Sequence, residues 1–150
     1  MQAADAGVRL VSRCRDGITA IADPNRLQQI LLNLLTNAIK FTPPGGTIEV
    51  RCDSDGERTR IRVRDDGIGI ESDQLQRIFS PFVQLDAAPI SAATTARGVG
   101  LGLAISRDLA RAMGGDVTAE STVGIGSVFT INLAAAAGVD VESEDAVPVV

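Results

Sequence analysis

The chain has 150 residues, about the length of one domain, and its 19 Asp and Glu outnumber 14 Lys and Arg, for a formal net charge of −5. It contains no histidine, which excludes His-ligated zinc, a Ser-His-Asp or Cys-His catalytic site and a phosphohistidine on this chain. The negative charge and an aromatic content of only 3% argue against nucleic-acid binding, and no apolar run reaches the roughly 20 residues of a membrane span.

Alternating apolar residues predict two short strands within residues 8–22. A helix follows from residue 24 to about residue 40, with Asp23 as its N-cap and a Pro in its first turn. Its buried face is expected to consist of the apolar residues at helical spacing, namely Leu27, Ile30, Leu31, Leu34, Leu35 and Ala38. The Pro and Gly residues of segment 42–46 end this helix.

Two β-hairpins are predicted, one from strands 47–53 and 58–65 and one from strands 116–121 and 127–133. Outward-facing arginines on the first hairpin are interpreted as a solvated sheet face, namely Arg51, Arg60, Arg62 and Arg64. Between the hairpins we expect three further elements: a short helix over 72–79 capped by Ser72, a long mobile loop over 83–99, and a helix over 100–113.

Together these elements predict an α+β fold, a two-layer sandwich with a mixed sheet and helices on one face. We expect one domain over residues 1–133, and a disordered acidic and Ala/Val-rich tail over 134–150. Cys14 and Cys52 stand far apart along the chain, and this spacing predicts no disulfide framework. Two isolated cysteines suit a reducing cytosol, so a cytoplasmic location is expected. The abrupt start of the chain suggests one domain of a longer protein.

A polar stripe runs along the first long helix. Asn33, Asn37 and Lys40 are spaced so that they fall within about 60° of one another on one helix face. A solvated helix face usually carries Glu, Lys or Gln, whereas Asn is a poor helix former. An amide oxygen is a suitable ligand for Mg²⁺ and a lysine can meet a phosphate, so this stripe is a candidate metal and phosphate site.

Two glycine-rich segments are further candidates. Asp65, Gly67 and Gly69 leave a strand, where a carboxylate could accept a hydrogen bond from an exocyclic amine and glycines could let a flat base approach the backbone. Residues 98–103 place several glycines before a helix, an arrangement whose backbone amides can bind an anion. A dinucleotide-binding site is excluded because this segment follows a loop rather than a strand, and a P-loop because no Gly-Lys-Ser/Thr is present.

Five segments then form an ordered pattern, NLLTNAIKFTPPGG (33–46), DDGIGI (65–70), IFSPFVQLD (78–86), GVGLGLAIS (98–106) and VGIGSVFTINL (123–133). Over residues 8–133 the sequence resembles the ATP-binding catalytic domain of bacterial sensor histidine kinases, in the GHKL ATPase superfamily. The resemblance implies a Bergerat fold, a five-stranded mixed sheet on about three helices, with ATP bound between the helices and a mobile lid.

The resemblance also implies roles for individual residues. Asn37 would bind Mg²⁺, with Asn33 and Lys40 near the phosphates, and Asp65 would bind the adenine amino group. The remaining nucleotide contacts would come from the glycines and their neighbours, namely Gly67, Gly69, Gly98, Gly100, Leu101 and Gly102, with Ser127 near adenine and Phe79 and Phe82 anchoring the lid.

Three features depart from the family pattern. Val99 stands where Thr is usual, and Gln84 stands where a phosphate-contacting Arg is frequent. Arg97 is the cation in the loop that could replace that charge. The histidine-bearing dimerisation helices that normally precede such a domain do not appear in this sequence.

The leading interpretation is therefore a protein histidine kinase domain that uses ATP and Mg²⁺, with a histidine-bearing dimerisation domain and a response regulator as partners. We expect no nucleic-acid partner and no direct membrane contact. A hydrolytic ATPase of the gyrase, MutL or chaperone type carries a Glu at the position of Asn33 to activate water, and the anti-sigma serine kinases resemble these enzymes at this position. Because an amide cannot act as a base, Asn33 argues against both alternatives. A nucleotide-sensing pseudokinase is the remaining alternative, because Val99 and Gln84 depart from the pattern.

Overall fold

The computed structural model describes residues 7–14, 18–80, 102–135 and 146–148. The described helices are α1 (Pro24–Phe41), α2 (Ser72–Leu75) and α4 (Gly102–Ala112). The strands are β1 (Arg9–Arg13), β2 (Thr19–Ile21), β3 (Thr47–Ser54), β4 (Arg58–Asp65), β5 (Asp116–Thr122), β6 (Gly126–Ala134) and β7 (Ala146–Pro148).

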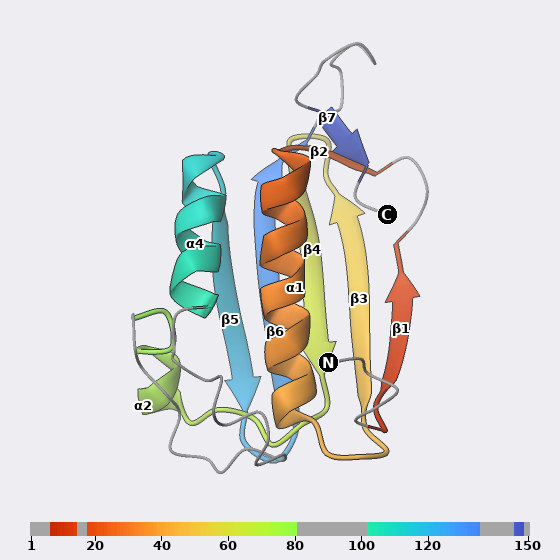
Figure 1. The fold of residues 1–150 in the computed structure, drawn as a ribbon, viewed down its shortest axis with the longest axis vertical. Coiled ribbons are helices and arrows are strands. Elements are labelled where there is room, and N and C mark those ends of the chain that lie inside the picture. Colours follow the sequence, from red (N-terminus) through yellow and green to blue (C-terminus); the bar gives the residue numbers. More distant parts are fainter. Residues whose placement is uncertain (1–6, 15–17, 81–101, 136–145, 149–150) are drawn as a thin grey trace.

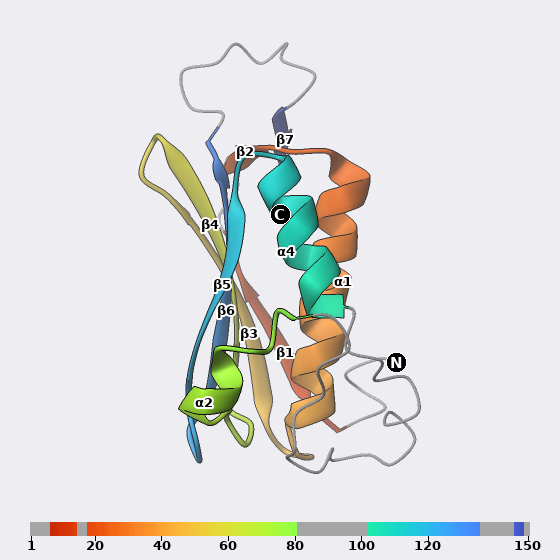
Figure 2. The ribbon, with the colours of Figure 1, turned by 90° about the vertical axis from the view of Figure 1, so that its left-hand side faces the viewer.

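A five-stranded mixed sheet in the order β1-β3-β4-β6-β5 forms one layer, and α1 and α4 cover one of its faces (Figures 1 and 2). β1 pairs with β3 in parallel, whereas the other neighbouring strands are antiparallel. The predicted α+β sandwich and both hairpins are therefore confirmed. The chain reverses at the ends of β4, α1 and β5, all of which lie at the lower end of the sheet in Figure 1.

Helix α1 begins where the sequence predicts, because the Asp23 side chain accepts hydrogen bonds from the backbone N–H groups of Asn25 and Arg26, at 2.9 and 3.4 Å. Four of its apolar residues are buried, namely Leu27, Ile30, Leu34 and Ala38. Leu31 and Leu35, which the spacing places on the same face, are partly buried against the edge of this core.

The core between the layers is aliphatic, as the shortage of aromatic residues predicts. Phe129 is its one fully buried aromatic among the described residues, and its ring lies 6.5 Å from that of Phe79 in an edge-to-face arrangement. Around it the inward faces of β3, β4, β5 and β6 contribute fully buried β-branched and leucine side chains, namely Ile48, Ile61, Val63, Val117, Ile131 and Leu133.

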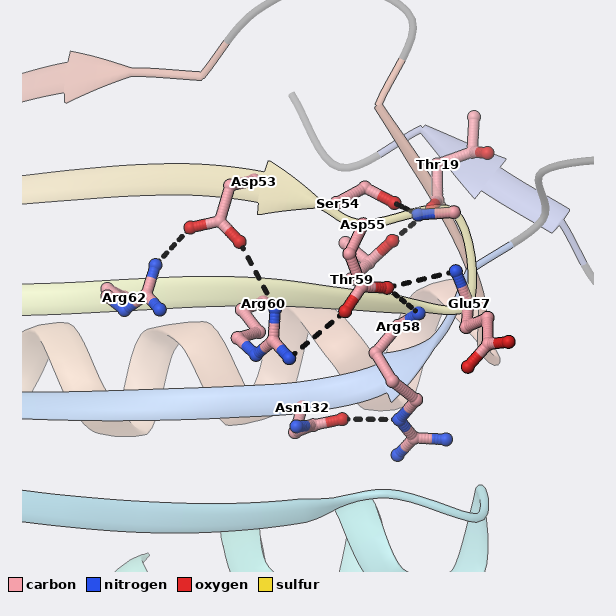
Figure 3. A network of polar contacts seen from close by, with 11 residues as sticks. Thr19, Asp53, Ser54, Asp55, Glu57, Arg58, Thr59, Arg60, Arg62 and Asn132 are labelled. Atoms are coloured by element: carbon pink, nitrogen blue, oxygen red, sulfur yellow. Dashed lines mark hydrogen bonds and ion pairs between the residues drawn. The ribbon is translucent and has the colours of Figure 1, made fainter.

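The face of the sheet that the helices leave uncovered carries the arginines of the first hairpin, as predicted. Asp53 lies between Arg60 and Arg62 and pairs with both, and Arg60 also reaches Asp55 at 3.2 Å (Figure 3). Arg58 donates to the side chain of Asn132 on β6 at 2.6 Å, which links the hairpin to the next strand.

Several predicted elements differ in the structure. Helix α2 ends at Leu75 because the chain continues in turns closed by bonds such as Arg77 N–H to Gln74 O, at 2.9 Å. Its N-cap is Glu71 rather than Ser72, and no side chain caps it. Helix α4 is described from Gly102 onward, and the predicted helix start at residue 100 and the predicted loop 83–99 lie outside the described residues.

The two predicted N-terminal strands are confirmed as β1 and β2, whereas the tail differs in part. β1 joins the main sheet, and β2 forms a separate antiparallel pair with β7. The prediction of a disordered tail is therefore wrong at residues 146–148, and also at Ala135, which forms a bridge with Ala20. The other tail residues from 136 onward lie outside the described part of the chain, so the division into a domain and a tail stays a prediction.

The expectation that the two cysteines stay unpaired is wrong. The structure joins Cys14 to Cys52 in a disulfide, although 38 positions separate them along the chain. The parallel register of β1 and β3 aligns Arg13 with Arg51, so the next residue of each strand lies beside its counterpart. Sequence spacing does not reveal this parallel pairing.

No helix in the described part of the chain is long and apolar enough to cross a membrane.

The cap of α1 yields a stability prediction. Asp23→Ala removes the acceptor of both N-terminal hydrogen bonds and should lower the free energy of unfolding by about 0.5–2 kcal/mol. Asp23→Asn keeps an acceptor oxygen and should lose only a small part of that. Urea denaturation of the three proteins measures both differences, and equal losses in the two variants would contradict the capping role.

Candidate functional site

The predicted carboxylate, Asp65, lies at the end of β4 in the lower part of the sheet and is only 4% exposed. Its neighbours in register are Ile48 on β3 and Ser127 on β6. Its Oδ1 accepts the backbone N–H of Gly67 at 3.0 Å. Burial raises the pKa of the Asp65 carboxyl, the backbone N–H groups of Gly67 and Ser127 partly offset this, and the charge of Asp66 adds to the rise.

The turn after Asp65 is packed between two other segments. On one side Ile68 N–H donates to the carbonyl of Phe41, the last residue of α1, at 3.3 Å. On the other side Ile68 O accepts from Gly124 N–H, in the turn between β5 and β6, at 2.9 Å. These contacts bring the end of α1 and the β5–β6 turn together beside Asp65.

The glycines of this turn are explained by backbone packing. A Cβ on Gly67 would lie 2.3 Å from Phe41 O, and a Cβ on Gly69 would lie 2.3 Å from Thr122 O, so neither position admits a side chain. Gly69 also has a φ of +78°, in the left-handed region. The sequence predicts that these glycines let a flat base approach the backbone. In the structure, a Cβ built on either glycine would instead point at a backbone carbonyl of the protein.

Ser121 is a residue that the sequence analysis missed. Its Oγ accepts the backbone N–H of Ile70 at 2.7 Å, donates to Gly126 O at 2.9 Å and lies 2.8 Å from Ser127 Oγ. Ser121 thus holds the end of the Asp65 turn against β6, and it places Ser127, which is 5% exposed, beside Asp65. One feature of the sequence could have indicated this role: Ser121 is a polar residue at an inward-facing position of a strand whose other inward-facing residues are apolar.

The polar stripe of α1 splits into two parts. Asn33 donates from its side-chain nitrogen to Gly102 O at 3.3 Å and to Ser106 Oγ at 3.1 Å, which links α1 to the first turn of α4. The side chain of Asn37 makes no hydrogen bond with the described residues, and it lies one turn closer to the Asp65 end of the helix. Lys40 Nζ lies 5.4 Å from the ring centroid of Phe41.

Gly102 is the first residue of α4, and a Cβ there would meet only the Asn33 side chain at 3.8 Å, which is an ordinary contact. The other predicted residues of this region lie outside the described part of the chain, namely Phe82, Gln84, Arg97, Gly98, Val99, Gly100 and Leu101. The structure therefore does not place them relative to Asp65 or Asn37.

Phe79 contacts helix α4 through Arg107. The Arg107 guanidinium lies 4.8 Å from the Phe79 ring centroid, and its Nε donates to Asp116 Oδ1 at 3.0 Å. Burial alone would raise the pKa of Asp116, but the hydrogen bond and charge of Arg107, the backbone N–H of Val117 and the hydrogen bond of Arg111 hold that pKa below its ordinary value. This contact fixes the chain just before residue 81, and Arg107 is a second residue that sequence reasoning missed.

The polar stripe of α1 carries the donor types that a magnesium–nucleotide complex would need, an amide oxygen on Asn37 and an ammonium group on Lys40. Among the described residues no three His, Cys, Asp or Glu side chains gather as a metal cluster. Asn37 offers one neutral oxygen, and Mg²⁺ commonly takes few protein ligands and completes its shell with phosphates and waters.

Comparison with known proteins identifies the family of this chain. The model of the family described as histidine kinase-, DNA gyrase B- and HSP90-like ATPases matches residues 22–137. An uncharacterised sensor-like histidine kinase of Rhizobium meliloti (strain 1021) is 43% identical over 121 residues, 80% of this chain and 22% of that protein. The sensor protein TorS of Escherichia coli (strain K12) is 41% identical over 117 residues, 77% of this chain and 12% of that protein. The chain thus spans about a fifth or less of these relatives.

Solved structures share the fold. ShkA, crystallised at full length in complex with AMPPNP, superposes with a TM-score of 0.74 at 37% identity, covering 90% of this chain and 27% of that one. The nucleotide-free catalytic domain of the histidine kinase ThkA gives a TM-score of 0.73 at 26% identity, covering 87% of this chain and 82% of that one. The motifs, the fold and these matches together mean that the chain belongs to the histidine kinase-, DNA gyrase B- and HSP90-like ATPase family, on the sensor histidine kinase branch.

Proposed function

We propose that this chain is the catalytic domain of a sensor histidine kinase, which binds Mg²⁺–ATP and transfers the γ-phosphoryl group to a histidine on a separate dimerisation domain. A response regulator would then receive the phosphoryl group. Phosphoryl transfer depends mainly on positioning and on charge neutralisation, which this chain can supply, whereas a chain without histidine cannot supply the acceptor. We place the reaction in the cytoplasm, where ATP is available.

The observation that carries this proposal is the environment of Asn33. Its side-chain nitrogen donates to Gly102 O and to Ser106 Oγ, and Ser106 Oγ itself donates to Gly102 O, so the amide group of Asn33 fits the start of α4 as a hydrogen-bond donor. A carboxylate there would face a carbonyl oxygen and lose that bond. Hydrolytic relatives use a carboxylate at this position to activate water, and Asn33 has no basic atom to do so. The local structure thus favours transfer over hydrolysis.

The nucleotide roles follow from the same arrangement. Asp65 would accept a hydrogen bond from the adenine amino group, held in place by the backbone N–H groups of Gly67 and Ser127. Asn37 would hold Mg²⁺, which neutralises the charge of the phosphates when bound, and Lys40 would add a positive charge near them. Gly98, Gly100, Leu101, Gly102, Arg97 and Phe82 remain proposed nucleotide contacts by resemblance.

The first prediction of the proposed function concerns recognition of the adenine base by Asp65. Asp65→Asn should weaken ATP binding roughly ten- to a hundredfold, because it loses a charge-assisted hydrogen bond worth about 1.5–3 kcal/mol. GTP should bind the unmodified chain much more weakly than ATP, since guanine presents a carbonyl to the carboxylate. Titration calorimetry measures both, with Asp66→Asn, the same change at the exposed neighbour, as the matched control. Equal affinities for ATP and GTP would rule out this role.

The second prediction concerns stability. The folded chain binds a proton at Asp65 more tightly than the unfolded chain does, because the pKa of Asp65 is raised by burial. Stability from this group is therefore largest at low pH and falls as the pH rises from the ordinary value of 3.8 through the raised pKa. Asp65→Asn should remove that fall, so the variant should gain stability relative to the unmodified chain as the pH increases.

Urea denaturation of both proteins, from about pH 4 to pH 7, measures this difference directly. Subtracting the two curves cancels the contributions of carboxyl groups with lowered pKa values, which change stability in the opposite sense. A difference that does not vary with pH, or one that shrinks as the pH rises, would contradict the account of Asp65.

The third prediction tests the reaction. With γ-labelled ATP the chain alone should release negligible phosphate and should not label itself, whereas an added histidine-bearing dimerisation domain should acquire an acid-labile label. Asn37→Ala should abolish most of this transfer while leaving binding of the adenine part largely intact. Steady phosphate release by the chain alone would indicate a hydrolytic ATPase, and binding without any transfer would indicate a pseudokinase.

A further inference from the structure

The only two cysteines of the chain meet at one edge of the sheet. Cys14 follows β1 and Cys52 lies within β3, and their Cα atoms are 4.7 Å apart, within the range that a disulfide spans. This proximity follows from the backbone, because Arg13 and Arg51 are partners in the parallel register just before them. The two sulfur atoms therefore meet without any displacement of either strand.

The two cysteines differ in exposure. Cys52 is 5% exposed and belongs to the buried core, whereas Cys14 is only partly buried at the edge of that core. A small disulfide in solution can therefore reach the sulfur of Cys14 more readily than that of Cys52. An accessible thiol beside a buried partner is the usual arrangement of an attacking and a resolving cysteine.

The bond joins an exposed edge strand of the five-stranded sheet to the strand beside it. Four of the five residues of β1 are exposed, and β1 is an edge strand that pairs only with β3. Opening of such a strand requires little free energy, so a covalent link to β3 should strongly change how often β1 opens. The link closes a loop with a sequence separation of 38 residues, long enough for a marked effect on the unfolded chain.

We propose that Cys14 and Cys52 form a reversible oxidation site, which low-molecular-weight disulfides of the glutathione type close and the corresponding thiols open, so that β1 is locked to β3 in the oxidised state. The Cys14 thiolate attacks the small disulfide, forming a mixed disulfide and releasing one small thiolate. The Cys52 thiolate then attacks the Cys14 sulfur, forming the protein disulfide and releasing the second. Two protein thiols are oxidised and one small disulfide is reduced to two thiols.

Reversibility rests on the cytoplasmic setting proposed above, since disulfides there are transient and are characteristic of redox sensing or catalysis. The site does not depend on nucleotide binding. Asp65 pairs with Ile48 at the start of β3, whereas Cys52 lies near the other end of that strand. The expected consequence of oxidation is a stiffer β1 rather than a changed adenine contact.

The test equilibrates the purified full chain in glutathione buffers of increasing oxidised fraction, and counts free thiols by mass spectrometry after rapid alkylation. We expect both thiols to disappear together, with the loss of two hydrogen atoms and no stable adduct, and to return when reduced glutathione is in excess. Hydrogen exchange of the β1 amides should slow at least about tenfold in the oxidised state, while exchange in β6 changes little. ATP binding in both states, measured in parallel, keeps this test separate from that of the proposed function.

Two matched variants assign the roles. Cys52→Ser should accumulate one glutathione adduct on Cys14, because the resolving thiol is gone, whereas Cys14→Ser should react far more slowly at the buried Cys52. Equal reactivity of the two variants would overturn the assignment of roles. Thiols that stay reduced at every buffer ratio, or a bond that excess reduced glutathione does not open in the folded protein, would overturn the proposal itself.

Discussion

Burial of the Asp65 carboxylate is the constraint on which the rest of the site depends. A carboxylate at 4% exposure is stable only with hydrogen-bond donors close to it, and the nearest are backbone N–H groups of the turn that follows and of β6. To supply them the turn must fold back tightly, so its backbone lies against the carbonyls of Phe41 and Thr122. Gly67 and Gly69 are the residues that such contact allows.

This packing also positions the residues that we propose lie near the phosphates. The Phe41 carbonyl that accepts from Ile68 is the end of α1, so the turn holds the helix whose polar stripe carries Asn37 and Lys40. At the other end of the stripe Asn33 holds the first turn of α4 through Gly102 and Ser106. Asp65, the proposed base-binding residue, Asn37, the proposed metal ligand, and the start of α4 are thus fixed relative to one another by backbone contacts and one amide.

Local signals in the sequence predict a large part of this arrangement. The cap and spacing of α1 and the alternation of both hairpins depend on residues close together in the chain, and they are confirmed. What the sequence does not predict depends on pairing between distant segments. The parallel register of β1 and β3 brings Cys14 beside Cys52, the association of β2 with β7 orders part of the tail, and Ser121 acquires its role only because β5 lies beside the Asp65 turn. The reason for Gly67 and Gly69 likewise lies in carbonyls from two other elements.

The most direct test of the central claim pairs a change in the protein with a change in the base. Titration calorimetry would compare ATP with the purine analogue that lacks the exocyclic amino group, each with the unmodified chain and with Asp65→Asn. If the Asp65 carboxylate binds the amino group, loss of that group should weaken binding to the unmodified chain at least about tenfold and should weaken binding to the variant less, because the amide oxygen of the variant accepts only a neutral hydrogen bond. An equal loss of affinity in both proteins would show that the amino group is bound elsewhere and would contradict the account.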